Sequence, residues 1–349
     1  MAISHVRIIG SGLIGSSIGL GLVQNQIEVS MVDTDPAAQA LAQDLMASSP
    51  HTEPDLVIIA TPLGSISRVL KGLDTSTVKL GFMDISSVKT KVLSDVEGSG
   101  LSRTRFLPSH PMAGREVGGA QSARADLFAG RPWIIDSHGV DPELRAAGLE
   151  IIKLLGATPI ELGSREHDQA VALVSHLPQI VSSLLAGQLR GANPQWLDLA
   201  GAGLRDTVRI AGSNPDLWKE IISANSGAIA PLLKKFIEDA ENLLSKIDNE
   251  DFIAEVIEGG AQGRALIPGK HGGKQRSYTY LPIIIEDKPG QLASLFDECA
   301  RAQVNVEDLA IEHSPGQFTG LITLALSESD AAKLSDHLRA HGWNVHAQR

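Results

Sequence analysis

Residues 5–33 combine the residue types and the spacing that binding of a dinucleotide requires. A short apolar run leads into Gly10, Gly12 and Gly15 in the pattern GxGxxG, and a helical pattern and a second apolar run then end at Asp33. Gly10 permits a tight turn, Gly12 lets a pyrophosphate approach the backbone, and Gly15 allows the helix to pack closely on the strand. The N-terminus of that helix offers unpaired N–H groups to the phosphates.

Asp33 indicates which dinucleotide is expected. Its carboxylate can accept both ribose hydroxyls, and it would repel a 2′-phosphate. Residues 34–36 bring no arginine that could receive such a phosphate. The sequence therefore favours NAD over NADP. A glycine-rich turn without a ligand is the alternative. It does not explain why the strand, the glycines, the helix and the acid follow one another in the order and spacing of a dinucleotide-binding unit.

His110 is the candidate base. It follows an expected strand, at the sheet edge where ligands bind, and Pro111 fixes the chain after it. A neutral imidazole there can take a proton from a substrate hydroxyl while a hydride leaves the same carbon. The alternative is a histidine that only bonds to backbone at a turn. Ser87 stands at another strand end, where its hydroxyl could orient the substrate or the imidazole, or cap the next helix.

Other polar candidates stand further along the chain. Arg209 lies among apolar and small residues, and a guanidinium can bind a carboxylate through two hydrogen bonds, although an ion pair with Asp206 or a surface position would also explain it. His176 and Trp218 lie in helical patterns, where core positions are more usual. Glu116 lies between glycines, in a loop that could gate a site or simply be solvated.

The composition excludes several classes of protein. The chain has 349 residues, enough for two or three domains, a net charge of −11 without a basic cluster, and one cysteine, Cys299. We expect no nucleic-acid partner, no disulfide and no membrane span, since the apolar runs read as too short and no signal peptide is evident. The histidines show no ligand spacing, so no metal site is expected. The sequence is typical of a cytoplasmic protein.

In the first half of the chain, apolar strands alternate with helices, which predicts a doubly wound parallel sheet covered on both faces. The expected strands include residues 6–9, 55–60, 80–85, 105–109, 133–136 and 157–161. Ligands bind beyond the carboxyl ends of such strands. We therefore expect the dinucleotide to contact Gly10, Gly12, Leu13, Ile14, Gly15, Asp33, Thr61, Pro62 and Ser86.

The pattern changes after residue 163. Residues 168–190 read as a helix that is apolar on most sides and contains Pro178, and Asn214 with Pro215 opens a long helix whose apolar stripe reaches Ile247. So much apolar helix surface favours an intertwined homodimer over a monomer with a large helical core. A glycine-rich linker follows, and the last seventy or so residues show the order βαββαβ of a small ferredoxin-like domain.

The chain resembles prephenate dehydrogenases that carry a C-terminal ACT domain. The motifs that carry the resemblance are GSGLIGSS at 10–17, DISSVK at 84–89, SHPMAG at 109–114, SHLPQ at 175–179, LRDTVRIA at 204–211, NPDLW at 214–218 and DKPGQL at 287–292. The resemblance implies an NAD-binding Rossmann domain (1–163), an all-helical substrate and dimerisation domain (164–262), a linker (263–277) and an ACT regulatory domain (278–349). It implies oxidative decarboxylation of prephenate to 4-hydroxyphenylpyruvate in tyrosine biosynthesis.

The resemblance also implies roles for single residues. His110 would accept the proton of the 4-hydroxyl of prephenate, and Ser87 would bond to that hydroxyl and to His110. Arg209 would bind the ring carboxylate, and Arg205 would reach the pyruvyl carboxylate from the partner subunit. His176 and Trp218 would line the site, Glu116 would gate it, and a tyrosine effector would bind near Asp287, Pro289, Gly290, Leu292 and Asn305. The neutral Gln179 favours prephenate, because users of arogenate need an acid for its ammonium group.

Three alternatives stay open. Arogenate dehydrogenase would use the same scaffold and form tyrosine directly. A 3-hydroxyacid dehydrogenase would usually need a catalytic lysine in the helical part, and no lysine stands between Lys153 and Lys219. A non-catalytic sensor of NAD and an amino acid would leave His110, Ser87 and Arg209 without a task.

Overall fold

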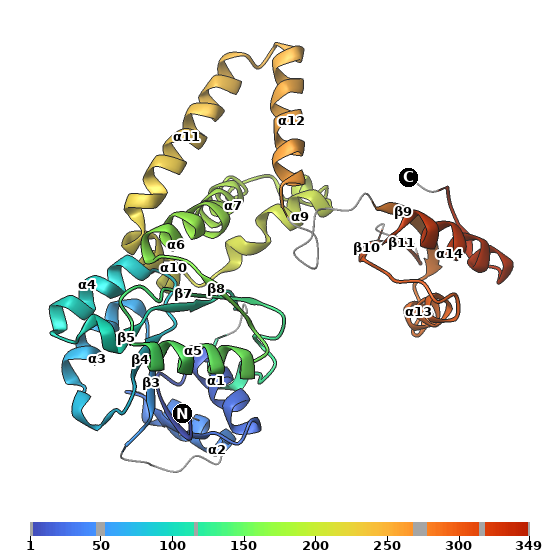
Figure 1. Ribbon diagram of the computed structural model, residues 1–349. Coiled ribbons are helices and arrows are strands. Elements are labelled where there is room, and N and C mark those ends of the chain that lie inside the picture. The colour runs from blue at the N-terminus through green and yellow to red at the C-terminus, as the bar shows by residue number, and fades with distance from the viewer. Residues whose placement is uncertain (1–2, 47–52, 115–117, 268–277, 314–317, 348–349) are drawn as a thin grey trace. The chain divides into compact units, whose positions relative to one another are not determined.

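The computed structural model describes residues 3–46, 53–114, 118–267, 278–313 and 318–347. The chain divides into two compact units, residues 1–238 and 239–349. Five parallel strands form the main sheet of the first unit, in the order β2-β1-β3-β4-β5 (Figure 1). They are β1 (His5–Ile9), β2 (Glu28–Val32), β3 (Leu56–Ile59), β4 (Gly81–Asp84) and β5 (Phe106–Leu107). The strand order reverses between β1 and β3, which is where a doubly wound sheet opens a crevice for a ligand.

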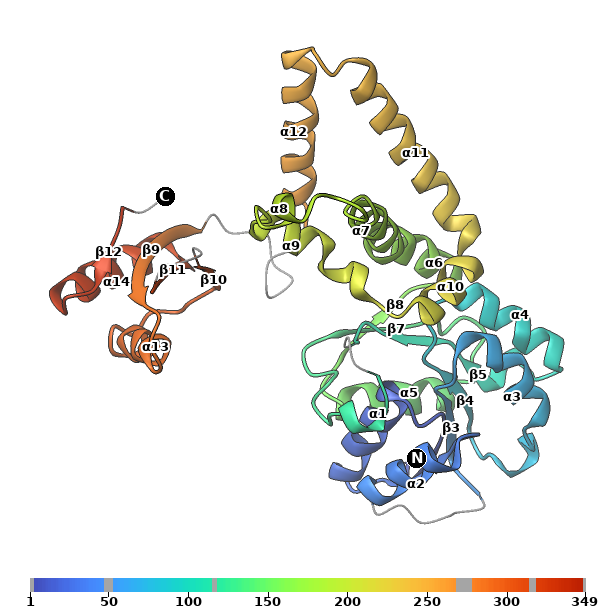
Figure 2. The same cartoon turned by 180° about the vertical axis from the view of Figure 1, so that it is seen from behind.

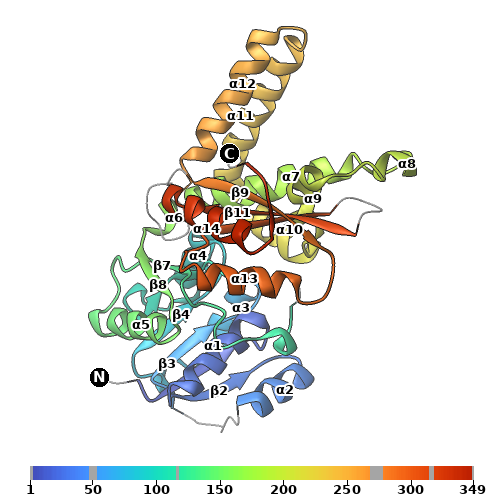
Figure 3. The same ribbon diagram turned by 90° about the vertical axis from the view of Figure 1, so that its right-hand side faces the viewer.

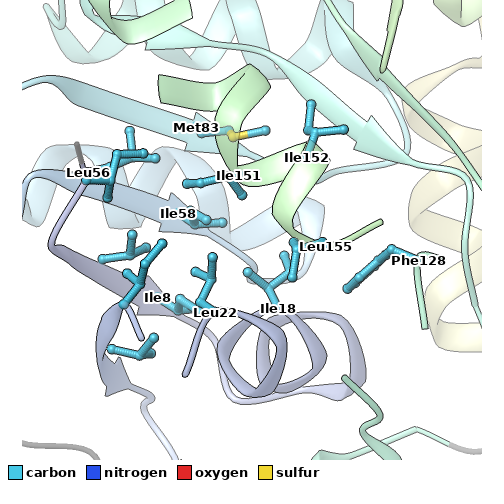
Figure 4. Packing of buried hydrophobic residues seen from close by; sticks show 14 of the residues in the cluster. Ile8, Ile18, Leu22, Leu56, Ile58, Met83, Phe128, Ile151, Ile152 and Leu155 are labelled. Atoms are coloured by element: carbon cyan, nitrogen blue, oxygen red, sulfur yellow. The ribbon is translucent and has the colours of Figure 1, made fainter. Parts of the chain in front are cut away.

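Helices cover both faces of this sheet (Figure 2). One face packs against α1 (Leu13–Gln24), α2 (Pro36–Met46) and α5 (Pro142–Leu154), and the other against α3 (Ile66–Gly72) and α4 (Lys89–Ser99). Figure 4 shows the first of these contacts, where Ile8 and Ile58 of the strands meet Ile18 of α1 and Ile151 of α5. Because both faces are covered, the strands read as continuous apolar runs, and the predicted doubly wound sheet is confirmed.

The strand predicted at 105–109 is divided at Pro108. The strand β5 ends at Leu107, and β6 (Ser109–Pro111) pairs antiparallel with β7 (Pro132–Ile135), which pairs parallel with β8 (Thr158–Glu161). These three strands form a separate sheet. A proline cannot donate to a ladder, so the main sheet stops there. The prediction that the strands at 133–136 and 157–161 extend the main sheet is therefore wrong, and His110 leaves the main sheet to enter the smaller one.

Helices follow from residue 164 onward. A continuous helical run contains α6 (Ser164–Val171), a π-helical turn (Ala172–His176) and α7 (Leu177–Gly187). Pro178 lies in the first turn of α7, and the wider π turn stands immediately before it. The remaining helices are α8 (Pro194–Leu197), α9 (Ala202–Val208), α10 (Pro215–Ala224), α11 (Ser226–Ser245) and α12 (Glu250–Ala265). The long helix predicted from Asn214 is thus two helices, divided at Asn225.

The helical run from Ser164 to Gly187 is long and apolar enough to cross a membrane, judged by length and composition alone. The prediction that every apolar run is too short for this is therefore wrong. Its polar side chains argue for a different setting. His167, Asp168, His176 and Gln179 are all buried inside the first unit. Length and hydropathy alone are weak evidence for a membrane span, and only 28% of the apolar window is buried. The run has a buried side that carries these polar groups, while Leu173, Val174 and Leu184 are exposed.

The second unit contains a four-stranded antiparallel sheet in the order β10-β11-β9-β12. Its elements follow one another as β9 (Thr279–Glu286), α13 (Gln291–Arg301), β10 (Asp308–His313), β11 (Thr319–Leu326), α14 (Glu328–Ala340) and β12 (Asn344–Val345). Figure 3 shows both helices beside the strands, and a shared apolar cluster joins Leu295 of α13 and Leu338 of α14 to Ile283 of β9. The predicted βαββαβ order is confirmed, and it is the order of ferredoxin-like domains.

Candidate functional site

The glycines of the turn after β1 meet different surroundings. Gly10 has a φ of +111°, and a Cβ there would lie 2.4 Å from the Ala60 carbonyl oxygen. A Cβ on Gly15 would lie 2.1 Å from the Gly10 carbonyl oxygen, so helix and turn pack too closely for any side chain. At Gly12, the N-cap of α1, nothing in the described part of the chain stands within 4 Å of the position that a Cβ would occupy. The turn is therefore closely packed at Gly10 and Gly15, and it leaves space at Gly12, where a phosphate would approach the backbone.

Asp33 lies directly after β2 and is half-buried. Its carboxylate accepts the backbone N–H of Ser11 at 2.6 Å and that of Asp35 at 2.9 Å. A carboxylate has about four acceptor sites, so capacity remains for ribose hydroxyls. The same side chain both shapes the glycine turn and presents an acid beside it.

Three buried hydroxyl groups at the carboxyl ends of the strands have no hydrogen-bond partner within the described part of the chain. They belong to Ser11 after β1, Thr61 after β3 and Ser86 after β4. Buried polar groups are normally hydrogen-bonded, and exceptions mark strain or an unoccupied ligand position. Their placement along the edge where a dinucleotide binds fits the groups that NAD would bring.

His110 of β6 belongs to a chain of three side chains. Its Nδ1 lies 2.9 Å from Nε2 of His167, and Nδ1 of His167 lies 2.8 Å from Oδ1 of Asp168. The Asp168 carboxylate also accepts the backbone N–H of Lys89 at 2.8 Å and that of Thr90 at 2.9 Å. It therefore caps α4 from another helix. Burial raises the pKa of Asp168, but the hydrogen bonds from these neighbours outweigh burial and lower it.

These contacts determine the tautomer of His110. An ionised carboxylate only accepts, so Nδ1 of His167 carries a proton, and in the neutral ring Nε2 of His167 is then an acceptor. His110 must then donate from Nδ1, which leaves a lone pair on its Nε2. Burial, and then the neighbouring His167 and Lys89, hold the pKa of His110 well below 6.5. His110 is consequently a neutral imidazole with one nitrogen held ready to accept a proton.

A buried ion pair supports the strand that carries His110. The Lys89 ammonium donates to the Asp84 carboxylate and, at 2.6 Å, to the Ser109 carbonyl oxygen, and both charged side chains are fully buried. Ser109 donates from its hydroxyl to the Asp84 carbonyl oxygen at 2.6 Å. Burial lowers the pKa of Lys89 while Asp84 opposes that shift. The pair joins the end of β4 to the start of β6, across the gap that Pro108 opens.

His176 and Trp218 come together on the helical side. The two rings are close to perpendicular, at 84°, with centroids 5.9 Å apart. Asn225 donates from Nδ2 to the Asp168 carbonyl oxygen at 2.8 Å and to Nδ1 of His176 at 3.1 Å. The proton of His176 therefore lies on Nε2, and burial lowers its pKa to about 4. His176 is therefore a neutral donor through Nε2, whereas His110 is an acceptor through Nε2.

Arg209 opens a 3₁₀ turn, Arg209–Gly212, that α7 supports. Gln179 donates from Nε2 to the Ile210 carbonyl oxygen at 3.0 Å, and the Ser213 hydroxyl donates to Gln179 Oε1 at 3.3 Å. The side chain of Arg209 is exposed, and Arg205 is exposed on the neighbouring α9. Gln179 thus holds the turn that presents Arg209.

Two further candidates need separate mention. Ser87 is half-buried between Ser86 and Val88, and Val88 is the N-cap residue of α4, without a side-chain cap bond. The helix-capping alternative for Ser87 is therefore wrong, since the Asp168 carboxylate accepts the N–H groups at the start of α4. Glu116 lies outside the described residues.

The residues that orient the base are not predicted from the sequence. The sequence assigns no role in orienting the base to His167, Asp168, Lys89, Asp84 or Asn225. Its one reading of Asp168, as a cap of its own helix, is wrong, because the carboxylate caps α4. One signal was available, because Asp84 and Lys89 are charged residues in a segment that otherwise reads as buried. Such charges are buried only when they are paired.

Comparisons with known proteins show the family of the chain. The family model of the prephenate dehydrogenase nucleotide-binding domain matches residues 22–159, and that of the prephenate dehydrogenase dimerization domain matches residues 163–256. The chain belongs to the prephenate dehydrogenase family. This membership confirms the prediction of a nucleotide-binding dehydrogenase with a helical dimerisation domain.

Relatives of similar length support the assignment. The probable prephenate dehydrogenase NovF of Streptomyces niveus is 29% identical, over 96% of this chain and 98% of that protein. The prephenate dehydrogenase of Bacillus subtilis is 24% identical, over 95% of this chain and 94% of that protein. Among solved structures, a putative prephenate dehydrogenase of Corynebacterium glutamicum is 26% identical, with a TM-score of 0.67, and covers 75% of this chain and 88% of that one.

A prephenate dehydrogenase from A. aeolicus, solved with hydroxyphenyl propionate and NAD⁺, shares the fold. It is 22% identical, with a TM-score of 0.68, over 76% of this chain and 99% of that one. An arogenate dehydrogenase from Synechocystis has a TM-score of 0.64 and 24% identity, over 74% of this chain and 98% of that one. These three solved structures match a shorter part of this chain than the relatives from Streptomyces niveus and Bacillus subtilis do.

Asp33→Asn should alter cofactor preference. Removing the negative charge weakens acceptance of the ribose hydroxyls and removes the repulsion of a 2′-phosphate, so we expect the ratio of kcat/KM for NAD to that for NADP to fall about tenfold or more. Asp35→Asn is the matched control, because Asp35 is exposed and bonds only within its own turn. Steady-state kinetics with both cofactors decide the matter, and an unchanged ratio in Asp33→Asn would contradict the assignment.

His167→Leu should lower kcat about a hundredfold, because His110 then lacks the partner that fixes its tautomer. The KM for NAD should stay unchanged. His167→Gln places an amide near the position of Nε2, where its oxygen can accept from His110, so it should recover part of the lost rate. If kcat fell equally in both variants, or if only KM changed, His167 would have a packing role and would not orient His110.

Proposed function

We propose that this protein is an NAD-dependent prephenate dehydrogenase, which converts prephenate to 4-hydroxyphenylpyruvate and CO₂ in tyrosine biosynthesis. Family membership supports the reaction class, and one observation carries the assignment of the base. The chain His110–His167–Asp168 supports His110 as a neutral acceptor, and the glycine turn of the same unit supports a dinucleotide site. A cytoplasmic location is part of this proposal, as is the division of the chain after residues 163, 262 and 277.

The cofactor site is formed by Gly10, Gly12, Asp33 and the strand ends near Thr61 and Ser86. NAD supplies the hydride acceptor when it is bound. His110 takes the proton of the 4-hydroxyl through Nε2 as the hydride leaves the same carbon. The electron pair released from the bond to the ring carboxylate then completes the aromatic ring, CO₂ departs, and the proton held on His110 Nε2 returns to the phenolate oxygen of the product. Formation of the aromatic ring makes the reaction effectively irreversible.

The carboxylates of the substrate need cationic partners. Arg209 binds the ring carboxylate from the turn that Gln179 holds, and Ser87 bonds to the hydroxyl that reacts. His176, with its proton on Nε2, lines the site as a neutral donor beside Trp218. Orientation of these groups supplies most of the rate enhancement, because the chemistry needs only one base.

A homodimer completes the site in this proposal. The family model that matches residues 163–256 describes a dimerization domain. Exposed apolar side chains on the helices supply the contact surface: Leu173, Val174, Leu184, Trp196 and Leu199. Arg205 from one protomer then reaches the pyruvyl carboxylate bound by its partner, and Glu116 gates entry to the site.

The second unit serves regulation. We propose that it contains an ACT domain, because its βαββαβ order and its antiparallel strand order fit that fold. The DKPGQL motif begins directly after β9 and runs into the first turn of α13. Gly290 in that motif has a φ of +88° and is the N-cap residue of α13. An amino-acid effector, tyrosine, would bind along Asp287, Pro289, Gly290 and Leu292, with Asn305 nearby in the chain.

His110→Asn tests the proposed reaction. An amide cannot take the proton, so kcat should fall by about two to four orders of magnitude while NAD binding persists. NADH formation is measured with prephenate and, in parallel, with arogenate. A larger kcat/KM with arogenate would identify an arogenate dehydrogenase, and a full rate in His110→Asn would rule out His110 as the base.

Tyrosine should inhibit the wild-type enzyme or raise its Tm. Gly290→Val strains a positive φ at the proposed effector loop, so it should reduce the effect of tyrosine and leave the basal rate unchanged. Activity and thermal melts with and without millimolar tyrosine measure both. Tyrosine that changes neither quantity in the wild type would contradict the effector site and leave the catalytic assignment untouched.

A further inference from the structure

Three side chains of the second unit converge between its two helices. Glu298 lies on α13, while His337 lies on α14 and His341 is the C-cap residue of the same helix. The two histidines are four residues apart, so they share one face of the helix. One ligand atom from each of the three side chains lies within 4.8 Å of the others. The shared apolar cluster under α13 and α14 holds the two helices together and so fixes this arrangement.

The histidines present the nitrogens that a cation needs. Nδ1 of His341 lies 2.8 Å from the backbone carbonyl oxygen of His337. A carbonyl only accepts, so the proton lies on Nδ1 and the lone pair of His341 Nε2 is available. Histidines that bind metals commonly donate their other N–H to a carbonyl in this way. The rings of His337 and His341 lie 4.3 Å apart between centroids, inclined by 35°.

Glu298 supplies the anionic ligand. Its side chain is buried, and Oε2 lies 2.6 Å from Nε2 of His337. Arg301 donates to the other oxygen, Oε1, at 2.5 Å. A carboxylate accepts, so His337 donates from Nε2, and a bound cation would take the place of that proton between the two side chains. One oxygen therefore neutralises Arg301, and the second faces the two imidazoles.

We propose that Glu298, His337 and His341 form a binding site for a divalent transition-metal cation of the Zn²⁺ class. Two imidazoles and one carboxylate form a ligand set that suits Zn²⁺, Co²⁺ or Ni²⁺, with water in the open position. An ion pair between His337 and Glu298 explains two of the three residues. It does not explain why His341 brings a third possible ligand atom within 4.8 Å of the other two.

The site is built from the second unit alone. A bound cation would connect the last turns of α13 and α14, and it would stabilise this domain by binding the folded chain and not the unfolded one. The expectation of no metal site overlooks the one-turn spacing of His337 and His341, which is visible in the sequence. Glu298, which stands far away in the sequence, could not be added to that pair without the fold.

The test uses the full-length protein, freed of metal with a chelator. Co²⁺ should bind at one equivalent per chain and give the visible absorption of a cobalt site with nitrogen and oxygen ligands, and Zn²⁺ should displace it and raise the Tm. His341→Ala should weaken Zn²⁺ binding at least about a hundredfold, because loss even of a second-shell partner costs ten- to a hundredfold. His341 is exposed and its hydrogen bond to the His337 carbonyl stays within its own helix, so the variant should fold.

His346→Ala is the matched control, since it removes an exposed histidine outside the cluster. It should bind Zn²⁺ as the wild type does. Glu298→Gln should weaken binding as His341→Ala does. Absence of binding by the wild type, or equal affinity in His341→Ala and the wild type, would overturn the proposal. Equal affinity in His341→Ala and the wild type would mean that the metal binds to other histidines, such as His110 and His167.

Discussion

The hydrogen bonds to the carboxylate of Asp168 connect the parts of the candidate site in the first unit. The carboxylate accepts two backbone N–H groups and the Thr90 hydroxyl at the start of α4, together with the ring N–H of His167. Asn225 donates to the backbone carbonyl of the same residue. One buried anion thereby caps a helix of the Rossmann part, orients the chain of histidines and connects to the helical part. Burial of such a charge is costly unless every acceptor site is used. The full set of partners explains why the geometry of the base is so closely determined.

The breaks in the helices follow from the same requirement. The π-helical turn Ala172–His176 places His176 between α6 and α7, and Asn225 interrupts what the apolar pattern reads as one helix. Asn225 uses its amide to bridge the Asp168 carbonyl oxygen and His176. Both irregularities occur where a polar side chain must turn inward from a helix. Local departures from ideal helix geometry often occur at such positions.

The sequence predicts local features of the site well and long-range ones poorly. The glycine turn and Asp33 could be predicted because their roles arise within a single βαβ unit. The division of the strand at Pro108 was missed because an apolar run does not show which sheet it joins. The partnership of His110 with His167 was also missed, since their contact spans 57 positions in the chain. When a helix is capped by a carboxylate from a distant helix, the sequence next to the capped helix shows no capping motif. A cap from a residue at the start of the same helix does leave such a motif.

The position of His167 has an electrostatic consequence. A carboxylate that contacts a catalytic imidazole directly favours the protonated ring and raises its pKa. Here the ring of His167 separates Asp168 from His110. The hydrogen bonds still orient His110, but the Asp168 carboxylate does not raise its pKa, which burial, His167, Lys89 and His176 lower. Burial and Lys89 then keep His110 neutral, which also makes it a weaker base. A weaker base suffices in the proposed reaction, because loss of CO₂ and formation of an aromatic ring supply a driving force that proton transfer alone would lack.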